Sequence, residues 1–218
     1  VPVKIEAGKV TETVKLINWE QPEKNDFAIA EEVTLRGKHE RRPDLVLYVN
    51  GIALGVLELK NSRITIGDGI RQCLSNQQPE FNAWFFSTVQ FVFAGNDSEG
   101  LQYGTVGTPE KSFLKWKEDE ADNSRFKLDK YLLKMCRKDR LIELMHDFVL
   151  FDGGVKKLPR VHQYFAVKAS QQRVLAYLGG IIWRPPFESD PSLHFGGNRK
   201  PLPPGSDQPF IPWTGPIR

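Results

Sequence analysis

The segment at residues 43–60, PDLVLYVNGIALGVLELK, constrains the fold of this chain more than any other. Two runs rich in Val, Leu and Ile flank a central Asn-Gly pair, a pattern that predicts a β-hairpin with a buried face. Three charged residues, Asp44, Glu58 and Lys60, stand in or beside these apolar runs. Burying a charge is costly unless it is paired or binds a metal. The segment therefore predicts a site built from two carboxylates and an ammonium group.

Whether Asp44 shares a face with Glu58 depends on the register of the hairpin, because side chains along a strand alternate between faces. A strict two-residue turn would send Asp44 to the opposite face. A three-residue loop at 49–51 pairs residue 44 with residue 56 and leaves the two acids roughly 7–8 Å apart at the backbone. We therefore expect that loop, with a positive φ at Gly51 and a β-bulge beside it.

Two carboxylates on one face suit a hard divalent cation. Mg²⁺ takes one or two carboxylates in proteins and keeps several waters. We expect Asp44 and Glu58 to hold it, with the backbone carbonyl of Leu59 as a further ligand. Lys60 would orient an attacking water or stabilise charge that develops on a phosphate. These groups predict metal-dependent phosphodiester hydrolysis, and the alternative is an ordinary surface Glu–Lys pair.

Two arginines, Arg41 and Arg42, stand immediately before the hairpin. Arginines at this place can contact the phosphates that flank a scissile bond in DNA. A solvated basic turn is an equally good interpretation of the same residues.

The motif and its surroundings are similar to a known family. Residues 42–44 (Arg-Pro-Asp) with 58–61 (Glu-Leu-Lys-Asn) resemble the PD-(D/E)xK nuclease motif as it occurs in the restriction (R) subunit of type I restriction endonucleases. Further segments resemble that family in order, namely 16–37, 67–77, 91–105, 113–119, 161–169 and 179–183, the last two resembling the start of its helicase motor. The resemblance implies an α/β fold, with a mixed sheet flanked by helices and followed by a helical spacer.

The helix after the motif commonly carries Gln-x-x-x-Tyr in that family. Gln72 matches the glutamine, and the resemblance implies a catalytic role for it, although a polar residue capping a strand end is an alternative. Asn76 stands at the tyrosine position, so the tyrosine role does not carry over. Gln163 matches a glutamine that lies near the adenine of ATP in the family, and here it is at most a remnant of that pocket.

The resemblance and the local patterns divide the chain into four parts: a nuclease domain at 1–120, a helical spacer at 121–158, a truncated start of the motor at 159–183, and a Pro- and Gly-rich tail at 184–218. The tail has no GxxxxGK[ST] loop and no periodicity, and we expect it to be disordered. The join at 183 indicates a truncated or frame-shifted subunit, and Val-Pro-Val at the start indicates missing residues in front. ATP would then be bound only by the full-length subunit, and this chain would neither hydrolyse it nor translocate.

Within these parts, we expect strands near 1–10, 27–35, 85–95 and 101–107, a helix at 66–78, and helical spacing from 128 that a glycine pair ends at 153–154.

Composition and charge indicate how large a core the chain can form, where it works and whether it attracts DNA by itself. With 218 residues, 40% of them hydrophobic, the chain can bury one full core. We expect a protein of a reducing cytoplasm, without a membrane span or a signal peptide, whose two cysteines lack metal or disulfide spacing. The resemblance implies that this cytoplasm is bacterial or archaeal. Residues 1–110 carry 11 Lys and Arg against 15 Asp and Glu, a net charge of −4. A motor or partner would therefore have to deliver DNA to this part of the chain.

The resemblance implies the DNA-cleaving module of a type I restriction-modification system, which cuts unmethylated foreign duplex DNA and is weakly active or inactive in isolation. A specificity subunit would choose the sequence and a modification subunit would methylate it. One alternative is a non-catalytic docking domain that couples the motor to the complex. A stand-alone repair nuclease is a third interpretation, disfavoured by the helicase-like residues 161–183.

Overall fold

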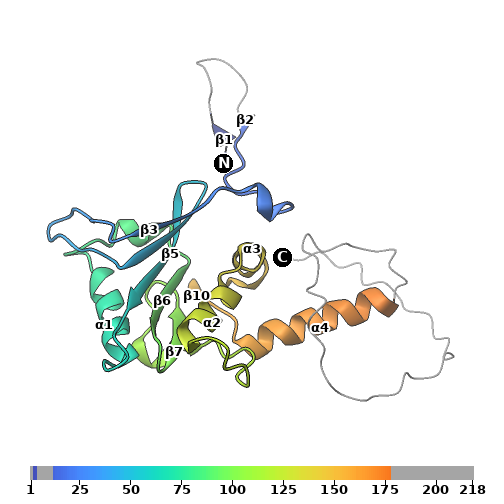
Figure 1. Cartoon of the computed structure of the whole chain (residues 1–218). Coiled ribbons are helices and arrows are strands. Elements are labelled where there is room, and N and C mark those ends of the chain that lie inside the picture. The colour runs from blue at the N-terminus through green and yellow to red at the C-terminus, as the bar shows by residue number, and fades with distance from the viewer. Residues whose placement is uncertain (1, 4–11, 178–218) are drawn as a thin grey trace. The chain divides into compact units, whose positions relative to one another are not determined.

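A computed structural model of the chain describes residues 2–3 and 12–177, all within one unit, Val1–Phe187. At its centre is a six-stranded sheet (Figure 1) in the order β3-β4-β5-β6-β7-β8. Its strands are β3 (Phe27–Glu31), β4 (Leu45–Val49), β5 (Ile52–Leu59), β6 (Phe91–Asn96), β7 (Gly100–Gly104) and β8 (Leu114–Lys115). Strands β5 and β6 pair in parallel and the other neighbours are antiparallel, so the sheet is mixed, as expected.

Helices and shorter elements connect and cover these strands. The helices are α1 (Ile66–Asn76), α2 (Lys127–Met135), α3 (Lys138–Glu143), which continues into the π-helical turn η4 (Leu144–Phe148), and α4 (Val161–Tyr177). Single 3₁₀ turns occur at η1 (Pro22–Lys24), η2 (Phe85–Ser87) and η3 (Glu110–Ser112). Two antiparallel ribbons pair β1 (Pro2–Val3) with β2 (Glu12–Thr13) and β9 (Leu150–Asp152) with β10 (Val155–Lys157). The start of the motor expected at 178–183 and the tail at 184–218 lie outside the described residues.

Strands β5 and β6 are parallel, so the chain must cross over between them, and helix α1 forms that crossover. It lies in the segment between β5 and β6 and buries Ile66, Ile70 and Cys73, which recur at helical spacing. Because this apolar stripe packs on β5 and β6, the polar residues at neighbouring helical positions are brought close to the end of β5.

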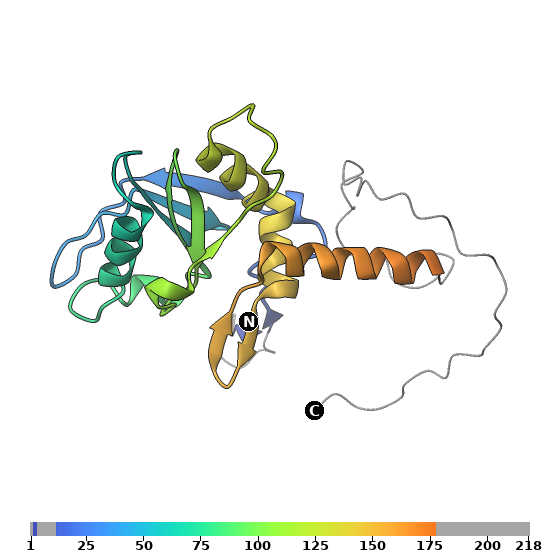
Figure 2. The same cartoon turned by 90° about the horizontal axis from the view of Figure 1, so that it is seen from below.

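Two hydrophobic clusters form on the sheet, one on each face. In β6, Phe91 and Phe93 belong to the cluster that includes residues of α2, α3 and η4, whereas Val92 and Ala94 belong to the cluster of α1. Figures 1 and 2 show the same division, with α1 on one side of the sheet and α2 and α3 on the other. The residues expected to form a helical spacer thus share a core with the sheet, and their division at residue 120 stays a prediction.

The turn of the β4–β5 hairpin differs from the expected one. Val49 pairs with Ile52, so Asn50 and Gly51 form a two-residue turn with φ values of 50° and 77°. The predicted three-residue loop is wrong, whereas the positive φ at Gly51 is confirmed. Two successive left-handed residues give the turn a twist that matches the flanking strands, and the Asn-Gly pair accepts that conformation at low cost.

A β-bulge compensates for the shorter turn. The register shifts by one between Leu47 and Tyr48, because Leu54 is an extra residue in β5. The bulge therefore exists, but farther from the turn than expected. Continued to the strand ends, the shifted register places Asp44 opposite Glu58. The expected pairing of residue 44 with residue 56 is therefore wrong, but the two acids still lie on one face of the sheet.

The glycine pair at 153–154 does not end a helix. Gly153 and Gly154 have φ values of 56° and 79° and form the turn between β9 and β10. The helical stretch ends earlier, at Phe148. The expectation was wrong because glycines with positive φ serve a hairpin turn as well as a helix terminus.

Helix α4 begins at Val161, in the segment that resembles the start of the helicase motor. It packs through Tyr164, whose ring lies against Phe148. Its 17 residues make it the longest helix that the structure describes, and neither it nor another helix of the described ranges is long and apolar enough to cross a membrane.

Candidate active site

Asp44 and Glu58 meet where β4 begins and β5 ends. Asp44 is half-buried and follows the buried Pro43. Its Oδ2 accepts a hydrogen bond of 2.6 Å from the backbone N–H of Leu59. The side chain of one acid is thus held at the strand end that carries the other, as the sequence pattern predicted.

Glu58 is a carboxylate inside the protein, with 0% of its surface exposed. Burial, which disfavours the charged form, raises its pKa from 4.5 to about 8, and the negative charge of Asp44 adds to the rise. The ammonium group of Lys60 and a hydrogen bond from Asn76 act in the opposite direction. Without a cation, Glu58 is therefore protonated over much of the range in which an ordinary glutamate is charged.

The two oxygens of Glu58 have different surroundings. Oε1 accepts a hydrogen bond of 3.1 Å from Nδ2 of Asn76. Oε2 is buried and has no hydrogen-bond partner among the described residues. The Nζ of Lys60 lies 3.9 Å from Oε2, at the limit of an ion pair. A buried oxygen of this kind lacks a compensating positive group at bonding distance.

Gln72 holds Lys60 in place. The Oε1 of Gln72 accepts a hydrogen bond of 2.7 Å from the Lys60 Nζ. The backbone N–H of Lys60 donates to the carbonyl of Gly95 at the end of β6, and its side chain is 16% exposed. The structure thus brings Gln72 of α1 to Asp44, Glu58 and Lys60 at the end of β5.

These groups fit a divalent cation of the magnesium type. The unsatisfied Oε2 of Glu58 and the raised pKa of that carboxyl are what a buried acid shows when a compensating charge is required. The described residues contain no group of three or more His, Cys, Asp and Glu side chains that could enclose a metal. Two carboxylates with several waters suit Mg²⁺ better than Zn²⁺. The Leu59 carbonyl as a further ligand stays a prediction.

The two arginines before the hairpin have partners within the chain. The guanidinium of Arg41 lies 4.0 Å from the centre of the Phe81 ring, and its backbone pairs with Leu35. Arg42 Nη1 lies 3.5 Å from Glu32 Oε2, with both side chains more than half exposed. Arg41 is thus held against a ring, whereas Arg42 stays largely exposed, and both the contact with DNA and the solvated turn stay open.

Gln163 has a structural partner at the start of α4. Its Oε1 accepts a hydrogen bond of 2.8 Å from the backbone N–H of Arg160, three residues earlier. This is the capping arrangement in which a Glu or Gln at the third helical position satisfies a free N–H group of the first turn. The expected adenine contact is not tested by this geometry.

Asn76 is the site residue that the sequence did not single out as functional. It is 1% exposed and donates to Glu58 from the last turn of α1. Its position four residues after Gln72 was the available signal, because residues four apart share one face of a helix.

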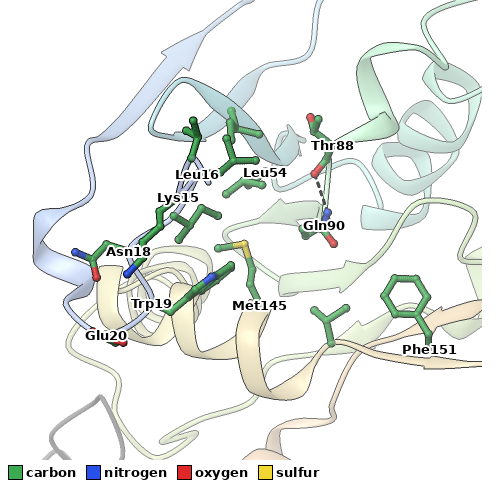
Figure 3. Close-up of a pocket in the computed structure, with 14 residues that line it drawn as sticks. Lys15, Leu16, Asn18, Trp19, Glu20, Leu54, Thr88, Gln90, Met145 and Phe151 are labelled. Atoms are coloured by element: carbon green, nitrogen blue, oxygen red, sulfur yellow. Dashed lines mark hydrogen bonds between the residues drawn. The ribbon is translucent and has the colours of Figure 1, made fainter. Parts of the chain in front are cut away.

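A cavity of about 760 Å³ lies at the other end of β5. Figure 3 shows Trp19, Leu54 and Met145 around it. Its charged lining residues are Lys15 and Glu20, a combination that offers neither paired acids nor a nucleophile with a base. The paired acids that the sequence pattern predicted therefore lie at the strand ends and do not line this cavity.

Known proteins with similar sequences belong to the family that the hairpin motif resembles. Residues 1–111 match the family described as the N terminus of the type I restriction enzyme R protein. Over 81% of its length, the chain is 28% identical to the putative type I restriction enzyme MjaVIIIP endonuclease subunit of Methanocaldococcus jannaschii. It is 25% identical over 72% of its length to the type I restriction enzyme HindI endonuclease subunit of Haemophilus influenzae.

A third relative, the type I restriction enzyme SauCOLORF180P endonuclease subunit of Staphylococcus aureus, is 23% identical over 73% of the chain. The chain spans only 16–18% of the length of these three relatives. The matched residues include the hairpin and α1, and the fold is the mixed sheet that such a nuclease requires. The chain therefore belongs to the family of type I restriction enzyme R protein N-terminal regions.

Proposed function

We propose that this chain is the DNA-cleaving module of the R subunit of a type I restriction-modification system, and that it hydrolyses phosphodiester bonds of unmethylated foreign duplex DNA with Mg²⁺. The observation that carries the proposal is the meeting of Asp44, Glu58 and Lys60 at adjoining strand ends, in a chain of this family. A simple Glu–Lys ion pair would leave no reason for a second carboxylate beside a buried one.

Each residue of the site has a role in this proposal. The carboxylates of Asp44 and Glu58 bind the cation, with the Leu59 carbonyl beside them. When bound, Mg²⁺ supplies Lewis-acid polarisation of the scissile phosphate. Lys60 directs its ammonium group at the phosphate oxygen on which charge develops, or orients the attacking water. Gln72 keeps that ammonium group in place through its side-chain carbonyl.

Arg41 and Arg42 would contact phosphates of the bound duplex next to the site. Arg42 and its partner Glu32 are 58% and 65% exposed, so their ion pair is weak and can be exchanged for a phosphate. Arg41 is held against Phe81 and would act from a fixed position.

The module would work within a larger assembly in the bacterial or archaeal cytoplasm. The net charge of −4 over residues 1–110 does not by itself attract DNA, which supports delivery by a motor. We propose that residues 121–158 join the nuclease part (1–120) to such an ATP-driven motor, which begins at 159–183. Specificity and modification subunits would choose and methylate the sequence. Gln163 would then be a remnant of the adenine pocket.

Substitution of Lys60 tests the proposal in an R subunit that carries this segment, assembled with modification and specificity subunits. Lys60→Ala should abolish DNA cleavage and leave ATP hydrolysis intact, because the lysine serves the cutting step alone. Lys111→Ala, an exposed lysine of η3, is the matched control and should cut normally.

Two other results would contradict the proposal. If Lys60→Ala cuts as fast as the unchanged subunit, the residue has no role in cleavage. If the substitution prevents assembly and abolishes both activities, the segment serves as a docking domain and the acidic pair is structural.

A further inference from the structure

Helix α1 places two amide side chains against the two charged residues that end β5. Gln72 contacts Lys60 and Asn76 contacts Glu58. The spacings agree, because four residues of helix rise about 6 Å and two residues of strand extend about 6.6 Å. One amide therefore meets each member of the Glu-x-Lys pair, with the helix and the strand running in opposite directions.

The Asn76 amide determines which oxygen of Glu58 is available. Its Nδ2 donates to Oε1, so a rotation of the carboxylate would break a buried hydrogen bond of 3.1 Å. Oε2 is then the oxygen without a hydrogen-bond partner among the described residues, and the one nearest to the ammonium group of Lys60. Asn76 itself is 1% exposed, so water cannot easily replace it.

We propose that Asn76 is a positioning residue of the cation site: its amide fixes the Glu58 carboxylate so that Oε2 faces the divalent ion. The inference rests on the proposed function, since it presupposes that Glu58 is a cation ligand. The resemblance gave no role to Asn76. This inference gives it one, which is to orient the metal ligand Glu58 through the oxygen that does not face the ion. The competing explanation is a purely structural amide near the end of α1, where the Asn76 carbonyl accepts from the backbone of Asn82.

Binding of Mn²⁺ to the 218-residue chain, followed by electron paramagnetic resonance, separates these explanations without relying on cleavage. Asn76→Leu keeps the approximate shape of the side chain and removes the donor. We expect it to weaken Mn²⁺ binding about tenfold or more, as is typical when a partner that orients a metal ligand is lost. Asn76→Ala leaves room for a water donor and should weaken binding less.

Ile70→Val is the matched control, because Ile70 is a buried residue of α1 in the apolar stripe. It should lower the unfolding temperature and leave the Kd for Mn²⁺ unchanged, whereas Asn76→Leu should raise that Kd. If Asn76→Leu does not fold, Asn76→Ala decides the question by the same comparison.

The outcomes distinguish this inference from the proposed function. If the unchanged chain binds Mn²⁺ no better than Glu58→Gln does, the cation site itself is wrong. If the unchanged chain binds Mn²⁺ and the folded Asn76 variants bind it equally well, Asn76 is structural and the inference is overturned while the cation site stands.

Discussion

The carboxylate of Asp44 accepts a hydrogen bond of 2.6 Å from the backbone N–H of Leu59, so an acid at the start of β4 is tied to the residue after Glu58. This contact joins the two strand ends that carry the proposed ligands. It also fixes the side chain of Asp44 beside Glu58, whose pKa is raised in part by the charge of Asp44. The contact depends on the bulge at Leu54, which restores the register that the two-residue turn would otherwise shift.

The buried Glu58 should make the stability of the metal-free chain depend on pH. Its pKa is about 8 in the folded chain and 4.5 when unperturbed, so the folded chain keeps a proton that the unfolded chain gives up. The free energy of unfolding should therefore fall, by on the order of a few kcal/mol, as pH rises from about 5 to about 8. Urea titrations with a chelator present, at several pH values, measure this.

Glu58→Gln should flatten that pH dependence, because the amide has no proton to lose. An equally steep fall in both proteins would mean that Glu58 is not the responsible group. Added Mg²⁺ should stabilise the unchanged chain most near pH 8, where the proton no longer competes with the ion.

Gln72 is expected to affect DNA cleavage because it holds the ammonium group of Lys60. Gln72→Ala removes the acceptor of the 2.7 Å hydrogen bond and leaves the ammonium group free to move. DNA cleavage by the assembled subunit should fall about tenfold, less than for Lys60→Ala, because the charge itself remains. Gln78→Ala, an exposed glutamine just beyond α1, should cleave normally. Equal rates for the Gln72 and Gln78 variants would remove Gln72 from the site.

A buried ion pair between Glu118 and Arg140 connects α3 to the segment that follows β8. Glu118 Oε2 accepts from Arg140 Nη1 at 2.7 Å and from Trp116 Nε1 at 2.9 Å, and both members of the ion pair are less than a tenth exposed. Glu118→Gln should lower the free energy of unfolding by about 3 kcal/mol, because it leaves the arginine charge buried without a counter-charge. Chemical denaturation measures the loss.

An exposed pair two residues away provides the comparison. Glu120 lies 2.9 Å from Lys117 with both side chains more than half exposed. Glu120→Gln should leave the free energy of unfolding almost unchanged, because solvent screens an exposed ion pair. If the two substitutions destabilise the chain equally, burial does not govern the strength of the Glu118–Arg140 pair.

The candidate site residues could be chosen from the sequence, but the detail of their hairpin could not. Charged residues inside apolar runs single out Asp44, Glu58 and Lys60 as candidates, but the register of the hairpin decides whether the two acids share a face. The choice between a two-residue and a three-residue turn depends on where the extra residue packs. Leu54 is 5% exposed in the core on one face of the sheet, and that packing is not visible in a local pattern.

The contact between Asn76 and Glu58 could not be predicted from the sequence either. The sequence locates α1 and gives its period, but not the rotation that directs position 76 at Glu58. That rotation follows from how the buried residues of α1, such as Ile70 and Cys73, pack on β6. Gln163 was recognised by resemblance alone, and its capping hydrogen bond to Arg160 depends on where α4 begins.

In the proposed site, Asp44 and Glu58 bind one divalent cation together. Crystals of the chain grown with Mn²⁺ and measured near the manganese absorption edge test this most directly. We expect one strong anomalous peak within about 2.0–2.3 Å of a carboxylate oxygen of each residue, and its loss in Glu58→Gln. Manganese at another place in the chain, or no peak between these two carboxylates at saturating Mn²⁺, would contradict it.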